Sequence, residues 1–216
     1  MSSVEIKSPM RGRRPGGRVS GREALLPVAT RFFSRYGYEG ASLRKIASEA
    51  GVDMALVARL FGSKSALWEA VLEYLLEKQR IHLAEIRDID EHFSTNPENS
   101  FRRFIRQLIT ISIDIPEFPS LLLNEAARGE VRLDHLLRYL VSPFRESCLP
   151  VIKQAIAHDI INGKQPEIIF ALLISAISLP IITPGLISQG AEQSSSFLDD
   201  MADEAIRLFA GSQIIF

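Results

Sequence analysis

The sequence predicts an all-α protein, in which a long helix joins a small N-terminal domain to a larger C-terminal helical domain. Three observations lead to this prediction. Apolar residues recur every three or four positions along most of the 216 residues, the period of an α-helix with one buried face. Two short helical segments meet at Gly51, and a nearly unbroken apolar run occupies 168–182. With 46% hydrophobic residues, the chain can bury a substantial core.

Composition divides the chain into three parts. A basic arm rich in Gly, Pro and Ser covers 1–21 and is expected to be disordered, a small helical domain covers 22–72, and a larger one covers 73–216. Residues 1–72 hold 12 Lys or Arg against 6 Asp or Glu, whereas the remainder holds 13 against 20. This asymmetry suits a protein whose N-terminal end meets a polyanion, although chance clustering on solvated faces would look the same.

The basic arm has two open interpretations. Its segment RGRRPGGR could lie along phosphates or enter a minor groove, or it could be an ordinary solvated tail. It lacks the apolar region of a signal peptide.

A first helix is expected to end at Gly37. Ser20 and Glu23 have the spacing of a capping box at its start. Pro27 would remove a backbone hydrogen bond, so the helix is kinked there or starts nearer Ala24. Its apolar residues keep helical spacing: Leu25, Val28, Ala29, Phe32 and Tyr36.

The segment 42–64, SLRKIASEAGVDMALVARLFGSK, predicts two short helices joined by a tight turn. Ser42 and Asp53 are expected N-caps, while Gly51 and Gly62 end the helices and Val52 fills the corner between them. The inward-facing residues are Leu43, Ile46, Ala47 and Ala50 in the first helix, then Val57, Leu60 and Phe61 in the second. Such an arrangement is a helix-turn-helix motif, whose second helix enters the major groove of DNA.

Further residues extend this pattern on both sides of the motif. They are Arg22, Ala29, Phe32 or Phe33, Gly37, Tyr38, Ser42, Leu43, Ile46, Ala47, Ala50, Gly51, Val52, Phe61, Ser63, Lys64, Leu67, Ala70 and Val71. With them, 22–71 resembles the DNA-binding domain of the TetR family of bacterial transcriptional regulators. The resemblance implies a homodimer, and a ligand cavity in the larger domain whose occupancy changes the separation of the two DNA-reading heads. One departure is Ala58, where the family usually carries a tyrosine that contacts phosphate.

Eight residues are predicted to contact DNA: Ser42, Arg44, Lys45, Met54, Ala55, Ala58, Arg59 and Lys64. Arg59 can grip a guanine edge or a phosphate, and Arg44 is a second candidate for a base edge. Ala55 and Ala58 could touch thymine methyl groups, while Ser42, Lys45 and Lys64 suit phosphate contacts. Met54 either contacts DNA or fills a gap between helices.

Four further helices are expected between residues 63 and 161. Ser63 caps the first, which carries Leu67, Val71, Tyr74 and Leu75 and continues to about Ile86. Pro97 opens the second, which ends at the sequence PEFP and carries the apolar stripe Phe101, Phe104, Ile105, Leu108, Ile111, Ser112 and Ile115. A short third helix covers 120–128. The fourth covers 132–161 and is bent or broken at Pro143 and Pro150, with Leu136, Leu137, Leu140, Val151, Ile152 and Ile156 as its apolar residues and Asn162-Gly163 at its end.

The apolar run after Pro166 predicts a dimer interface. It holds 15 residues from 168 to 182, fewer than the roughly 20 that a membrane-spanning helix needs. A helix that is apolar all round must be covered on every side, most simply by the same helix of a second subunit. We therefore expect a homodimer built on the helices near 166–182 and 195–209.

Six apolar residues could line the implied ligand cavity: Phe101, Phe104, Leu108, Phe118, Leu121 and Phe144. Ordinary core packing explains the same residues. If a ligand binds, an apolar or aromatic one is expected.

No catalytic, metal or cofactor motif is recognisable. His82, His92, His135 and His158 lack metal-ligand spacing, and the acidic cluster around Asp88, Asp90, Glu91 and His92 suits a solvated helix end. The single Cys148 fits a core position in a protein of the reducing cytoplasm.

The leading interpretation is a non-enzymatic repressor that a small apolar effector releases from a pseudo-palindromic operator. Two alternatives stay open. One is an all-helical small-molecule-binding or membrane-surface protein without sequence-specific DNA binding, and the other is a helical enzyme without a recognisable motif.

Overall fold

The computed structural model describes residues 21–128, 131–187 and 195–210. These residues are helical apart from loops and one isolated antiparallel bridge between Ile161 and Ala210. The all-α prediction is confirmed. The helices are α1 (Gly21–Gly40), α2 (Leu43–Glu49), α3 (Met54–Phe61), α4 (Lys64–Glu91), α5 (Pro97–Asp114), α6 (Glu117–Ala126), α7 (Val131–Leu136), α8 (Ser142–Ala157), α9 (Pro166–Ile182) and α10 (Ser195–Phe209). Shorter turns are η1 (Phe93–Thr95), η2 (Leu137–Val141) and η3 (Pro184–Leu186).

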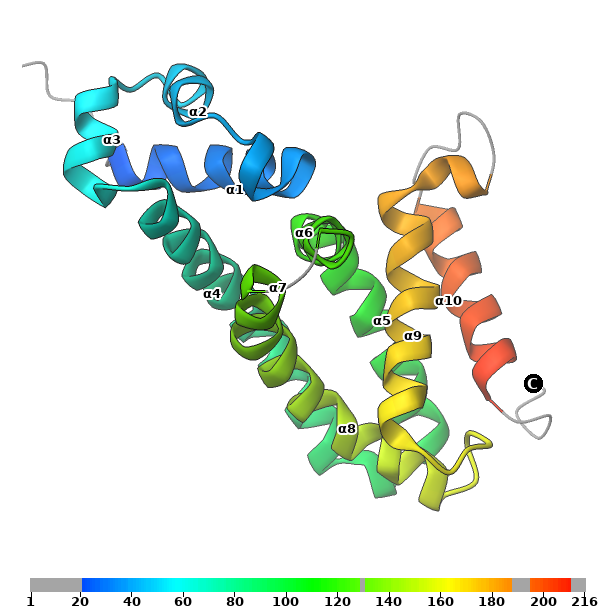
Figure 1. Cartoon of the computed structure of the whole chain (residues 1–216). Helices are drawn as coiled ribbons and strands as arrows, with labels where there is room; N and C mark the ends of the chain where they lie inside the picture. The colour runs from blue at the N-terminus through cyan, green and yellow to red at the C-terminus, as the bar shows by residue number, and fades with distance from the viewer. Residues whose placement is uncertain (1–20, 129–130, 188–194, 211–216) are drawn as a thin grey trace, which may run out of the picture.

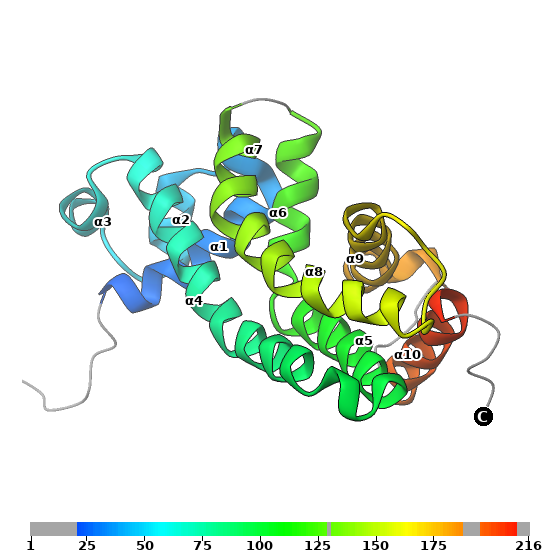
Figure 2. The ribbon, with the colours of Figure 1, turned by 90° about the horizontal axis from the view of Figure 1, so that it is seen from below.

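Helix α4 connects the two ends of the molecule. Figure 1 shows α1, α2 and α3 gathered at one end of α4, with α5 and α8 packed along its other half. Helix α9 packs on α5 and α8, and α10 packs on α5. The expected domain boundary after residue 72 falls inside α4, which continues without a break. Helix α1 also packs on α6, so the N-terminal helices contact the larger helical part at a second place besides α4 (Figure 2).

Of the two alternatives predicted for α1, a kink at Pro27 or a start nearer Ala24, the later start is wrong. The helix begins at Gly21 rather than near Ala24, and Pro27 lies inside it. The proline removes one intrahelical hydrogen bond, but buried Leu26 and Val28 on either side hold this turn in the core. The predicted stop at Gly37 is confirmed, because its φ of 67° breaks the helical path before a last turn to residue 40. The basic arm and Ser20 lie outside the described residues.

Helix α4 is longer than predicted. Ser63 caps it as expected, since its Oγ accepts a hydrogen bond from the backbone N of Ala66 at 3.0 Å. The helix continues past Ile86 to Glu91 because Ile89 extends the buried face by another turn.

In the next segment, prolines lie at the starts of helices rather than at their ends. Pro97 opens α5 as predicted, with Asn96 as its cap. Helix α6 begins at Glu117 rather than 120, because Pro119 sits in its first turn, where a backbone N–H has no intrahelical partner to lose. The PEFP sequence therefore belongs largely to α6, and Phe118 is buried there.

The helix predicted over 132–161 is divided. Helix α7 leads into the π-helical segment η2, which ends just before Pro143 opens α8. The π-helical turns are wider than α-helical turns, and they lead directly to Pro143. Proline lacks an N–H, so an ordinary α-helical hydrogen bond cannot form at that position. Leu137, one of the apolar residues of the predicted helix, lies in η2 and is 38% exposed.

The end of α8 was also predicted wrongly. The helix ends at Ala157 rather than at Asn162-Gly163. Asp159 adopts a left-handed φ of 58°, and the N–H of Ile160 bonds the carbonyl of Ala155 at 2.9 Å. These are the features of a Schellman motif, in which an aspartate takes the position that usually belongs to glycine.

The last two long helices match their predicted ranges. Pro166 opens α9, and α10 covers 195–209. Helix α9 buries one face, including Phe170, Leu173 and Ile177, and leaves apolar residues of its other face exposed: Ile168, Leu172 and Leu179. Within the described residues, no helix is both long and apolar enough to cross a membrane.

Candidate nucleic-acid interface and ligand cavity

The turn between α2 and α3 is set by one glycine. Gly51 has a φ of 67°, and the N–H of Val52 bonds the carbonyl of Ala47 at 3.0 Å. Glycine adopts this left-handed conformation at little cost, so it ends α2 and turns the chain toward α3. Asp53 then caps α3 by accepting a hydrogen bond from the N of Leu56 at 2.6 Å. Ser42 occupies the N-cap position of α2, but its side chain makes no capping hydrogen bond.

Helix α3 presents the predicted outer face. Met54, Ala55, Ala58 and Arg59 are all exposed, while Val57 and Phe61 are buried. Leu60, predicted to face inward, is 36% exposed. Leu56 and Leu60 flank the buried stripe and approach Gly21, where α1 begins, so they lie at the edge of the packed face. Both views place α3 at the outer end of the molecule (Figures 1 and 2).

Three cations of the helix-turn-helix are exposed on its surface. Arg44 and Lys45 in α2 and Arg59 in α3 are exposed and make no ion pair within the described ranges. Lys64 differs, because its Nζ donates to the carbonyl of Glu39 at 3.1 Å and lies 4.8 Å from the ring centre of Tyr38. Its ammonium is thus held on the protein surface, and Arg44, Lys45 and Arg59 are the cations of the motif available to a polyanion.

An aromatic cluster holds α1 against α4. The ring of Phe33 meets the edge of Trp68 with centroids 5.2 Å apart, and Tyr38 contacts both rings at 5.9 and 5.6 Å. Such packing fixes the position of the helix-turn-helix on α4.

Polar groups of α6, of the turn that follows it and of α7 hold the C-terminal end of α1. We call this set the interdomain clamp; it consists of Asn124, Glu125, Arg128 and Arg132. Asn124 Nδ2 donates to the carbonyl of Ser34 at 2.5 Å, and Arg128 Nη1 donates to that of Tyr36 at 3.0 Å. The carboxylate of Glu125 accepts from the backbone N of Tyr38 at 3.1 Å and from Nε of Arg132 at 3.2 Å.

Arg132 completes the interdomain clamp. Its guanidinium pairs with Glu39 at 3.0 Å and lies 4.4 Å from the ring centre of Tyr38. Gly37 suits this position, because its φ of 67° is strained for other residues and a Cβ here would displace the guanidinium of Arg128. Sequence reasoning missed the interdomain clamp; a glutamate inside the apolar segment SLLLNEA was the one available signal that a charge is buried there.

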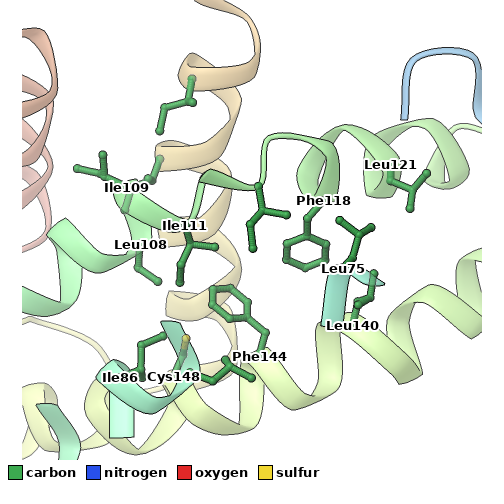
Figure 3. Close-up of a cluster of buried hydrophobic side chains, with 14 of the residues drawn as sticks. Leu75, Ile86, Leu108, Ile109, Ile111, Phe118, Leu121, Leu140, Phe144 and Cys148 are labelled. Atoms are coloured by element: carbon green, nitrogen blue, oxygen red, sulfur yellow. The ribbon is translucent and has the colours of Figure 1, made fainter. Parts of the chain in front are cut away.

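A cavity of about 210 Å³ lies among α5, α6, α8 and α9, and η2 contributes Val141. Phe118, Phe144 and Phe170 line it, together with three serines: Ser112, Ser175 and Ser178. The rings of Phe118 and Phe144 meet edge to face with centroids 6.0 Å apart, as Figure 3 shows. Pro119 and Leu122 of α6 also line the cavity, so one helix borders it and carries part of the interdomain clamp.

The structure separates the six residues predicted to bind a ligand. Phe118 and Phe144 line the cavity, whereas Phe101, Phe104, Leu108 and Leu121 are buried outside its lining. The cavity meets α5 near its C-terminal end, at Ile111 and Ser112, and the three residues of α5 that do not line it lie earlier in that helix.

The acidic cluster near residue 90 forms a helix end. Arg103 hydrogen-bonds Asp88 at 2.9 Å and thereby lowers the pKa of that carboxyl group, while Asp90 accepts from Nε2 of Gln154 at 2.6 Å. No group of His, Cys, Asp and Glu within the described ranges is arranged to hold a metal ion. Cys148 is fully buried, and burial raises the pKa of its thiol.

Comparison with known proteins identifies the family. Residues 25–71 match the family model described as bacterial regulatory proteins, tetR family. The helix-turn-helix domain of the chain belongs to the TetR family. The transcriptional regulator RutR of Escherichia coli (strain K12) is 32% identical to this chain over 118 residues, which make up 55% of this chain. They make up 53% of RutR, so the chain matches about half the length of that relative.

Solved structures share the fold over nearly the whole chain. HlyIIR, a hemolysin II transcriptional regulator, is 21% identical with a TM-score of 0.65, over 89% of this chain and 98% of HlyIIR. The ketosteroid transcriptional regulator KstR2 of Mycobacterium tuberculosis is 17% identical with a TM-score of 0.66, over 92% of this chain and 100% of KstR2. At these identities the likeness shows the fold alone.

Proposed function

We propose that this TetR-family chain is a DNA-binding repressor that a small ligand releases from a pseudo-palindromic operator. The observation that carries the proposal is the exposed face of α3, with the unpaired Arg59 at the outer end of a helix-turn-helix. Arg44 and Lys45 add positive charge on α2, which suits the phosphate backbone. The alternative without DNA binding is not favoured, because the matched relatives are transcriptional regulators.

We infer that specificity comes partly from DNA shape. The outer face of α3 offers one strong hydrogen-bonding side chain, Arg59, beside Met54, Ala55 and Ala58. Two alanines can contact thymine methyl groups but cannot define a long sequence by hydrogen bonds. A deformable operator would supply the remaining selectivity.

We also propose that the protein acts as a homodimer through α9 and α10. Ile168, Leu172 and Leu179 leave an apolar face of α9 uncovered, and Leu208 of α10 is 80% exposed. A second copy covering these side chains would place two α3 helices about one DNA turn apart. A DNA-binding role together with a single buried cysteine favours the cytoplasm.

The proposed release mechanism runs through α6. Its N-terminal half lines the cavity through Phe118 and Pro119, and its C-terminal half holds α1 through Asn124 and Glu125. A ligand that displaces the N-terminal half of α6 would shift the contacts that hold α1. The distance between the two DNA-binding domains of the dimer would then change.

Selection of bound duplexes from a random pool tests the proposed function. We expect enrichment of a pseudo-palindrome, bound by the full chain with a Kd in the range of about 10⁻⁸–10⁻¹¹ M and at least about 10³-fold more weakly when scrambled. Equal binding to the enriched and scrambled duplexes would exclude sequence-specific regulation. A preference for one isolated half-site would instead contradict the dimer.

A further inference from the structure

We propose that the cavity takes a neutral aromatic molecule of one or two fused rings, which donates a hydrogen bond to the hydroxyl oxygen of Ser178. The proposal rests on the regulatory function proposed above, in which this molecule is the effector. It follows from the size of the cavity, the absence of charge in its lining, and the direction of the hydrogen bonds at its polar end.

The size of the cavity limits the ligand. An engineered apolar cavity of about 150 Å³ in another protein holds benzene. The cavity here is about 210 Å³, so it has room for a substituted benzene or an indole-sized pair of fused rings. A steroid-sized or long-chain molecule would need the helices to separate.

The lining selects for an uncharged and aromatic molecule. It contains no Asp, Glu, Lys, Arg or His, so a charged ligand would lose its hydration without gaining a counter-charge. Phe144 contacts Phe118 and Phe170 in edge-to-face geometry, with centroids 6.0 and 5.8 Å apart. A flat ring between them would extend the same arrangement.

The serines give the polar end of the cavity a direction. The Oγ of Ser112 donates to the carbonyl of Leu108 at 2.9 Å, which uses its single proton. The Oγ of Ser178 lies 3.0 Å from that of Ser112 and therefore donates to it. Both hydroxyl protons are then committed, and the oxygen of Ser178 has lone pairs left to accept a hydrogen bond.

This direction discriminates between ligands of the same shape. A molecule with an N–H or O–H can donate to Ser178, whereas one with only an acceptor finds no free proton at Ser112 or Ser178. Ser175, the third serine of the lining, is exposed and lies outside the buried pair of Ser112 and Ser178, so the direction set by that pair does not extend to it.

Isothermal titration calorimetry of the full chain without DNA tests the proposal. The probes are indole, which donates through its N–H, benzofuran, which has an oxygen in that place, and benzoate, which is charged. We expect indole to bind roughly 5- to 100-fold more tightly than benzofuran, since an unpaired buried polar group is costly. Benzoate should not bind measurably.

Two serine variants complete the test. Ser178→Ala should remove the preference for indole over benzofuran, and Ser175→Ala, the matched change on the same helix, should keep it. Equal binding of the two probes by the unaltered protein, no binding of either, or a preference that survives Ser178→Ala would overturn the proposal. Because no DNA is present, these outcomes are independent of the duplex selection, which alone tests operator binding.

Discussion

The backbone N–H of Tyr38 donates a hydrogen bond to the carboxylate of Glu125, with N and Oε1 3.1 Å apart across 87 positions of sequence. Only 2% of Glu125 is exposed, and its other oxygen accepts from Arg132. This pair joins the end of α1 to α6, so the helix-turn-helix is attached to the larger domain by polar contacts as well as by the continuous α4. Two predictions about stability and signalling follow from it.

Replacing Glu125 should destabilise the protein. Glu125→Ala leaves the N–H of Tyr38 and the guanidinium of Arg132 without their shared acceptor, at a cost of about 1–3 kcal/mol in the free energy of unfolding. Glu125→Gln keeps one oxygen acceptor and should lose less. Urea unfolding measures both values. As a control, Glu77→Ala removes an exposed ion pair with Arg80 and should change stability by less than about 0.5 kcal/mol.

The same substitution should weaken communication between the domains. If the interdomain clamp transmits the displacement of α6, Glu125→Gln should reduce the factor by which a bound effector lowers operator affinity, while ligand affinity in the absence of DNA stays the same. The ratio of operator Kd values with and without saturating ligand measures this coupling. An unchanged ratio would remove Glu125 from the signalling route.

Arg59 should set selectivity at one base pair. Arg59→Ala is expected to weaken operator binding by about 1–3 kcal/mol and to relax discrimination at that position, because the face of α3 has no second strong donor. Binding to a set of single-base operator variants measures both effects. Arg87→Ala, an exposed arginine in the distal half of α4, serves as the control. An equal loss of operator affinity in both variants would mean that Arg59 contributes only non-specific positive charge.

Leu172 should be part of the subunit interface. It is 56% exposed on α9, so Leu172→Lys should convert the dimer to monomers in sedimentation experiments and lower operator affinity, since two reading heads are no longer linked. Ile81→Lys is the matched control, because Ile81 is 79% exposed on α4, away from the proposed interface. A Leu172→Lys protein that remains dimeric would place the interface elsewhere.

Features determined by local chemistry were predictable from the sequence. The left-handed turn at Gly51, the cap at Asp53 and the helix starts at Pro97 and Pro166 each depend on a few adjacent residues. The outer face of α3 followed from helical spacing, although Leu60 at its edge did not.

Features that depend on tertiary packing were not predictable in the same way. The partners of the interdomain clamp are far apart in sequence, and no local pattern relates Glu125 to Tyr38. The left-handed Asp159 replaced the expected glycine stop, and the π-helical segment turned Leu137 outward. The cavity lies among several elements, so apolar periodicity indicated buried phenylalanines but could not separate its lining from the surrounding core.

Gln79 should be a source of instability. It is completely buried on α4, and neither of its amide atoms has a hydrogen-bond partner among the residues that the structure describes. Gln79→Leu removes these unpaired groups and keeps a similar volume, so it should stabilise the protein by about 1–3 kcal/mol, measured as a higher urea midpoint at unchanged slope. Leu83→Gln, one turn further along the same buried helix, should have the opposite effect. A destabilised Gln79→Leu protein would show that the amide has a partner in solution.

Alkylation of Cys148 should report global unfolding. The thiol is completely buried, and burial raises its pKa, so the thiolate that reacts with iodoacetamide is scarce and inaccessible in the folded chain. At pH 8 the labelling rate should therefore increase with urea in parallel with the fraction of unfolded protein, and it should be slow in its absence. Ala84→Cys, which adds an exposed thiol on α4, should be labelled rapidly without urea. Rapid labelling of Cys148 in the unaltered protein would mean that α8 opens locally, and the core around Phe144 would then be less rigid than its packing indicates.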